Sequence, residues 1–339
     1  MSQPTASSFP VSIQRRRALR WSALACVGAM APMTAWSQTA TWPTRSVKIV
    51  VPYAAGGPAD VVARELAQRL GSETGQTIII ENLGGGMGLP ALNAVTRAEP
   101  DGHTLYMPAL GNVVLQPLLS KTSGGAEQLA RLRPVTMVST AAHVLVVSSK
   151  LPVRNVNELI EYAKAQPGRV SFASAGTGGT AHLGMEMFKA LSKTDVLHVP
   201  YRGSAGAMAD LASGQVSAMF SSLPSLQGLA DKGLVRVIAT TAPSRLAATR
   251  DLPQMSASLP GFEYTTWYAM YAPADTPQPL VDRINQVLRK TLSDPALAAR
   301  IEPHGTELLA TTPDKVQEWV RRDTEKWSRV IRDSGIKLD

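Results

Sequence analysis

Residues 46–70 read SVKIVVPYAAGGPADVVARELAQRL, and this stretch decides the fold. Its β-branched run at 47–51 predicts a buried parallel strand. Pro58 suits the first turn of a helix because its missing N–H would have no partner there, and apolar residues recur after it at helical spacing. The glycine turn between the strand and the helix start presents unpaired N–H groups at the positive end of a helix dipole. We therefore expect an anion-binding turn at 53–58, although such glycines also occur for tight packing alone.

The same arrangement returns later in the chain. Residues 169–174 (RVSFAS) predict a strand, 175–179 a glycine loop, and 180–191 a helix. Strands and helices alternate regularly between the two units, which predicts two α/β domains with a ligand between them. We expect the first domain to comprise residues 41–141 and 267–339, and the second domain residues 142–266.

Residues 1–37 have the pattern of an export signal. Four arginines precede the mostly apolar segment 21–35, and Ala35-Trp36-Ser37 offers small residues for cleavage. The apolar segment is shorter than the ~20 residues of a membrane span. We expect a periplasmic protein cleaved near Ser37. Arg16-Arg17 resembles a twin-arginine pair without the usual aromatic, so the sequence leaves the export route open.

Removal of this signal changes what the composition implies. The single cysteine, Cys26, lies within it, so the mature chain has neither a disulfide nor a thiol nucleophile. Four of the 34 Lys and Arg residues are also lost, which leaves 30 against 26 Asp and Glu, a net charge of +4. No basic cluster alternates with aromatics, and we expect no nucleic-acid partner.

Reactive groups are scarce in the sequence. The five histidines show no metal-ligand spacing, and no G-x-S-x-G is present, so we expect no metal, no cofactor and no catalytic residues. Gly86-x-Gly88-x-x-Ala91 fits a loose dinucleotide pattern, but the acidic residue that should end the next strand is missing. His182 is more consistent with bracing a loop than with general-base catalysis. Trp319 and Trp327 fall on the apolar side of a last helix at 312–332, where we expect both in the core.

A series of short motifs resembles a known family. In order, the motifs are Pro52-Tyr-Ala-Ala-Gly-Gly-x-x-Asp60, Glu81-Asn82 before a glycine turn, Pro100-Asp-Gly102, Ser174-Ala-Gly-x-Gly178 with His182-Leu183, Val199-Pro-Tyr-x-Gly-Ser204, Leu223-Pro-Ser225, Lys326-Trp327 and Gly335-Ile336. Together they resemble the Bug family, the periplasmic substrate-binding receptors of tripartite tricarboxylate transporters. The resemblance implies a type II periplasmic-binding-protein fold, in which two α/β domains close on a small carboxylate that is delivered to the transporter's membrane subunits. We expect a monomer.

The resemblance also implies a set of ligand-binding residues. These are Tyr53, Ala55, Gly56, Gly57 and Asp60 in the first domain, with Gly111 and Asn112, and Ser174, Ala175, Gly176, Thr177, Gly178, Gly179, Thr180, Tyr201, Ser221 and Ser222 in the second. The family often has an acidic residue where Ser221-Ser222 stand, so we expect a carboxylate without an amino group. Whether Asp60 faces the ligand or caps its helix is left open. So are a sensing role without transport and, as a weaker alternative, an exported hydrolase or isomerase on the same fold.

Overall fold

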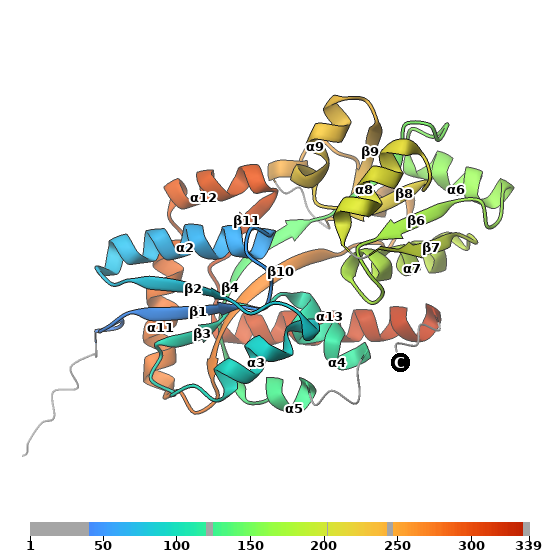
Figure 1. Ribbon diagram of the computed structural model, residues 1–339. Coiled ribbons are helices and arrows are strands. Elements are labelled where there is room, and N and C mark those ends of the chain that lie inside the picture. The colour runs from blue at the N-terminus through green and yellow to red at the C-terminus, as the bar shows by residue number, and fades with distance from the viewer. Residues whose placement is uncertain (1–40, 120–124, 202, 243–246, 335–339) are drawn as a thin grey trace, which may run out of the picture. The chain divides into compact units, whose positions relative to one another are not determined.

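The computed structural model describes residues 41–119, 125–201, 203–242 and 247–334 (Figure 1). The expected export signal at 1–37 therefore lies outside the described residues, as does Gly335-Ile336. From Trp42 onward the described residues belong to one compact unit that contains two β-sheets, one of six strands and one of five.

The six-stranded sheet has the order β11-β4-β10-β3-β1-β2. Its parallel part joins β1 (Val47–Val51) to β2 (Ile78–Asn82) on one side and to β3 (Thr104–Tyr106) on the other. Its antiparallel part comprises β4 (Leu132–Ala142), β10 (Thr265–Pro273) and β11 (Thr306–Leu308). Because β1, β2 and β3 are parallel, the loops that follow them leave from the same edge of the sheet.

Helices cover both faces of this sheet. Ile49 packs on one face with α2 (Pro58–Thr74), α11 (Gln278–Leu292) and α12 (Pro295–Ile301), whereas Val50 packs on the opposite face with α3 (Leu89–Thr96) and α13 (Pro313–Ser334). Burial on both faces explains why 49–51 form a continuous apolar run rather than an alternating one, while Lys48 near the start of the strand is exposed.

The five-stranded sheet has the order β7-β6-β8-β5-β9. Its strands are β5 (Val144–Ser148), β6 (Ser171–Ser174), β7 (Leu197–Pro200), β8 (Ala218–Ser221) and β9 (Val235–Thr240), and β6 lies parallel to both β7 and β8. Its helices are α6 (Val156–Ala165), α7 (Thr180–Ser192), α8 (Ser204–Ser213), α9 (Leu223–Asp231) and the short α10 (Met255–Ser258). We call this sheet with its helices the second lobe, and the six-stranded sheet with its helices the first lobe.

The chain passes between the lobes at two places. β4 runs through His143 directly into β5, and the chain returns along β10, which pairs with β4 from Thr265 opposite Ala142 to Pro273 opposite Leu132. One hydrophobic core extends from the first sheet to the second and includes Tyr106, Phe172 and Trp327. The exact bounds of the two domains, at 141/142 and 266/267, stay a prediction.

The long helix α13 contacts β4 of the first lobe and α7 of the second. Trp327 is fully buried on it, as predicted. The prediction for Trp319 is confirmed in part, because Trp319 packs against the same core but is only partly buried, and the Arg322 guanidinium lies 4.8 Å from the centre of its ring. Arg322 covers the outer side of this indole, so a partly exposed position is stable there.

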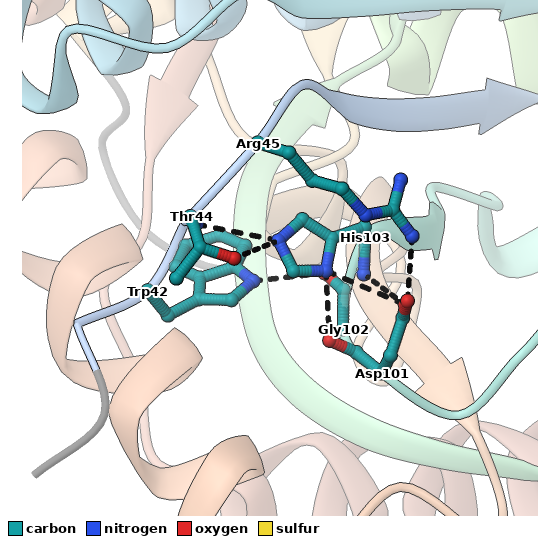
Figure 2. A network of polar contacts seen from close by, with 6 residues as sticks. All are labelled: Trp42, Thr44, Arg45, Asp101, Gly102 and His103. Atoms are coloured by element: carbon teal, nitrogen blue, oxygen red, sulfur yellow. Dashed lines mark hydrogen bonds and ion pairs between the residues drawn. The ribbon is translucent and has the colours of Figure 1, made fainter.

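Side-chain contacts fix the first described residues to the turn before β3 (Figure 2). The Trp42 indole N–H donates to the Gly102 carbonyl over 2.9 Å, and Arg45 pairs with Asp101 over 2.6 Å. The Thr44 backbone N–H donates to the His103 ring. The Pro100-Asp-Gly102 motif therefore anchors the start of the fold.

Six short helices complete the described elements. They are Gly86–Gly88 (η1), Gly111–Leu115 (η2), Gln116–Leu119 (α4), Gly125–Leu129 (α5), Ala247–Thr249 (η3) and Glu302–His304 (η4).

Candidate ligand-binding site

The first glycine loop leads from β1 into α2 as the sequence predicted. Gly57 is the N-cap residue of α2, Pro58 is its first residue, and the first intrahelical bond runs from the Val61 N–H to the Gly57 carbonyl. The N–H groups before Val61 therefore have no partner inside the helix. Gly56 has φ +83°, a conformation that L side chains rarely adopt, which explains a glycine at that position.

Asp60 braces this loop from inside the helix. Its Oδ2 accepts hydrogen bonds from the Gly56 N–H and from Arg64 Nε, each over 2.8 Å, and the residue is buried. Burial acts to raise the pKa of Asp60, but the hydrogen bonds from Arg64 and the Gly56 N–H outweigh it and lower the pKa. Asp60 is thus an ionised group whose charge is paired with Arg64 within the first lobe.

A buried asparagine joins the loops that follow β1, β2 and β3. Asn112 Oδ1 accepts from the Tyr53 hydroxyl over 2.6 Å and from the Ala109 N–H over 3.1 Å, while its Nδ2 donates to the Met87 carbonyl over 3.1 Å. Burial raises the pKa of Tyr53, so its hydroxyl remains a neutral donor. The Tyr53 carbonyl in turn accepts from Asn82 Nδ2. Asn112 therefore positions three loops through its side chain. Gly111, the other predicted residue of this segment, is half-buried.

The second glycine loop leads from β6 into α7 in the same way. Gly179 is the N-cap residue, Thr180 starts the helix, and the first intrahelical bond runs from the Leu183 N–H to the Gly179 carbonyl. Ser174 Oγ lies 2.7 Å from His198 Nε2 and donates to the Gly176 carbonyl. The small residues of this loop, Ala175, Thr177 and Gly179, are exposed.

A histidine pair lies beside the second loop. The Gly178 N–H donates to His182 Nδ1 over 2.9 Å, which agrees with the predicted loop-bracing role. The His182 ring stacks on His198 with centroids 3.8 Å apart, and Glu186 lies on its other nitrogen at 3.8 Å. Burial first, and then the neighbouring His198 and Lys189, lower the pKa of His182 to about 4. At neutral pH its Nδ1 is therefore an acceptor for the loop.

The remaining predicted residues follow β7 and β8, which run parallel to β6. The Tyr201 N–H donates to the Ser174 carbonyl, and its hydroxyl donates to Asp210. Ser221 ends β8, and Ser222 precedes α9 with its hydroxyl bonded to that of Ser225. Sheet topology thus gathers the second-lobe candidates at the carboxyl ends of three parallel strands, as it gathers the first-lobe candidates at the ends of β1 and β3.

Three residues that hold the loops were absent from the predicted set, namely Asn82, Met87 and His198. Asn82 is the last residue of β2 and belongs to a motif that we used only for the family resemblance, so a signal for it was present. His198 precedes Val199-Pro-Tyr201 on an adjacent strand, and nothing in its local sequence indicates the contact with Ser174.

A cavity lies beside the Ser221-Ser222 candidates. It has a volume of about 560 Å³ and is lined by residues of α9, η3, α12 and η4 and by the residue after η4, namely Leu223, Pro224, Gln227, Ala248, Ala299, Glu302, Pro303 and Gly305. It therefore borders both lobes, although neither glycine loop lines it.

Within the described part of the chain, no group of three or more His, Cys, Asp or Glu side chains is placed to hold a metal ion. None of the described helices combines the length and apolar character that crossing a membrane requires.

The model of the tripartite tricarboxylate transporter family receptor matches residues 62–336. The chain belongs to this receptor family. Protein BugT of Bordetella pertussis is 30% identical over 316 residues, which cover 93% of this chain and 96% of BugT. A solved Rhodopseudomonas palustris structure with adipate is 31% identical, has a TM-score of 0.77 and covers 88% of this chain and 99% of that one. MatC from the same species, with bound malate, is 28% identical at a TM-score of 0.71 and covers 86% of this chain and 100% of that one.

These comparisons confirm three predictions. The receptor has the two-domain α/β fold of the periplasmic binding proteins of its family. It is a Bug-type receptor, and the family consists of solute receptors that act outside the cytoplasm rather than enzymes. The alternative of an exported hydrolase or isomerase is therefore not supported.

Proposed function

We propose that this receptor binds a small carboxylate between its two lobes and delivers it to the membrane subunits of a tripartite tricarboxylate-type transporter. The observation that carries the proposal is the pair of braced glycine loops. Each follows a strand within a parallel pair, each contains the N-cap glycine of a helix, and each is tied down by a buried side chain of its own lobe. Helix N-termini with free N–H groups favour anions.

Among the described residues, the cations nearest the loops are already paired with carboxylates, which supports binding through amides and hydroxyls. Arg64 pairs with Asp60 beside the first loop, and Lys189 lies 3.5 Å from Glu186 near the second. Solved relatives with adipate and malate make small di-acids the first compounds to test. Mass spectrometry of the acid that co-purifies with the receptor, followed by calorimetry with that acid, tests the proposal directly.

The N-cap glycines allow a matched pair of variants. Gly57 and Gly179 have extended backbones with φ −78° and −73°, and an added Cβ would meet nothing closer than 3.6 Å and 3.5 Å. Gly57→Val and Gly179→Val should therefore fold while their side chains block the approach of a ligand to the amides. Gly228→Val is the control, because a Cβ there meets no atom within 4 Å and α9 carries none of the proposed loop amides. Undiminished affinity in both loop variants would mean that the ligand binds elsewhere.

We also propose that the receptor is exported, cleaved near Ser37 and monomeric. Within the described part of the chain, the first side chain that bonds to the rest of the fold is that of Trp42. Cleavage near Ser37 would therefore leave only a few residues before Trp42. Intact-mass measurement of periplasmic material would reveal the cleavage site, and a species that retains residues 15–20 or carries lipid on Cys26 would contradict it. Light scattering would report the oligomeric state.

A further inference from the structure

Met87 has an unusual backbone conformation for its residue type. Its φ is +55° and its ψ 22°, in the left-handed region that non-glycine residues enter at an energetic cost. Among the described residues only Lys193 shares a positive φ without being glycine, and Lys193 ends helix α7, where that conformation is common. Met87 has no such explanation, because it stands between two glycines inside η1.

The Met87 side chain is also exposed although it is large and apolar. Its exposed fraction is 51%, the second highest among the large hydrophobic residues described as exposed. A glycine at this position would avoid the strained φ and a polar residue would avoid the exposed apolar surface. Strained backbone at non-glycine residues clusters at ligand-contact sites, and here the strained residue also has an accessible apolar side chain.

The loop contacts fix Met87 close to the proposed carboxylate site. Its carbonyl accepts from Asn112 Nδ2, and Asn112 Oδ1 accepts from the Tyr53 hydroxyl. Two glycines of the same loop, one before and one after Met87, pack closely as well. A Cβ on Gly84 would lie 3.0 Å from the Ala54 N, and one on Gly88 would lie 2.5 Å from Asn112 Nδ2. The backbone of Met87 is thus held against the first glycine loop while its side chain remains uncovered.

We propose that Met87 provides the apolar contact for the hydrocarbon part of the ligand and favours longer or aromatic acids over short ones. This inference rests on the proposed carboxylate-binding function. A thioether side chain is flexible and polarisable, so it fits hydrocarbon bodies of different shape. The amide-lined loops would hold the carboxylate, and Met87 would discriminate among acids by what lies beyond it.

The test compares affinities for succinate, adipate and benzoate by calorimetry. Met87→Asn removes the apolar contact while keeping a residue type that tolerates the left-handed conformation. Burial of about two methylene groups predicts that this variant weakens adipate binding by about tenfold while succinate binding changes by less than about twofold. Ile79→Thr is the matched control, because Ile79 is exposed to 46% on β2, within the strand rather than at its carboxyl end, and its replacement should leave all affinities unchanged.

Met87→Gly provides a second, independent signature. It removes the strained conformation, so the variant should unfold at higher denaturant concentration than wild type and yet lose the same discrimination between adipate and succinate. Equal weakening of all acids in Met87→Asn, or unchanged adipate binding, would overturn the inference and leave the proposed function intact. Wild-type protein that binds neither these acids nor the acid that co-purifies with it would instead overturn the proposed function together with this inference.

Discussion

Replacement of His182 by asparagine should remove a specific part of the pH dependence of stability. The Asn Oδ1 can occupy the place of His182 Nδ1 and accept from the Gly178 N–H, which now reaches that nitrogen over 2.9 Å. Asparagine cannot take up a proton. The variant therefore keeps the hydrogen bond to the loop and loses only the titration.

The expected magnitude follows from the pKa of His182, which burial and the nearby His198 and Lys189 lower from 6.5 to about 4. Because the folded pKa lies below the unfolded one, the unfolded chain binds the proton more readily. The contribution of His182 to the free energy of unfolding is therefore fully present above pH 6.5 and is lost as the pH falls from 6.5 towards 4. Between about pH 7.5 and about pH 4.5, this linkage predicts a loss of roughly 2.5 kcal/mol in wild type that is absent in His182→Asn.

Urea unfolding of both proteins at a series of pH values measures the difference. Burial also shifts the pKa of two neighbours, upward for Glu186 and downward for His198, but both groups remain in the variant. The difference between the two curves therefore reports the titration of His182 together with its coupling to these two neighbours. His182→Leu is the control for the hydrogen bond itself, since it should lose stability at all pH values. Parallel wild-type and His182→Asn curves would show that His182 titrates normally and that its ring is not held neutral against the loop.

Three further outcomes are expected. Asn112→Ala should lower the free energy of unfolding by about 2–4 kcal/mol in urea denaturation, because it leaves the Ala109 N–H and the Met87 carbonyl without their partner, whereas Ile79→Thr, outside this network, should lose less; equal losses would contradict the network. Ser221→Asp should weaken dicarboxylate binding and improve binding of aspartate or glutamate in calorimetry, since a carboxylate repels a second acid group and attracts an ammonium. Tight amino-acid binding by wild type, unchanged in the variant, would refute the role of this serine. An acid at about a hundredfold excess over its dissociation constant should stabilise the receptor by about 2.7 kcal/mol in thermal unfolding, and scattering should show compaction; stabilisation without compaction would favour a rigid pocket.

The strand, glycine turn and helix units could be predicted because their signals are local. The run at 47–51 is buried on both faces of a sheet, and Pro58 starts α2, so periodicity and proline position were sufficient. The long strand β4 was missed because its partners, β10 and β11, lie far away in sequence and supply the pairing that the segment needs. α9 and α12 were also missed, since both are short helices that tertiary packing stabilises.

The candidate site was predictable in its loops but not in what holds them. Glycines and helix starts mark the two loops in the sequence, whereas the contacts that position them join distant residues. Tyr53 and Asn112 are 59 positions apart, and Ser174 and His198 are 24 apart. Composition gives no information about such pairs. The resemblance implied that Asn112 touches the ligand, which stays a prediction, whereas its buried contacts with three loops had no signal in the sequence.

The pairing of charges inside each lobe bears on how a receptor of this kind releases its ligand. A cationic side chain aimed at the carboxylate would be left without a partner after release, and an unpaired charge in a partly buried site is costly. Here Arg64 is already bonded to Asp60, and the helix-start amides carry only partial charges that water can satisfy in the empty state. In the proposed site, affinity would depend on both lobes contributing amides at once, and separation of the lobes would weaken binding without exposing the charge of Arg64. Variants that place a lysine at an exposed loop position such as Ala55 should accordingly bind acids more tightly and release them more slowly in stopped-flow measurements. Faster release from Ala55→Lys would refute this view of the amide-only site.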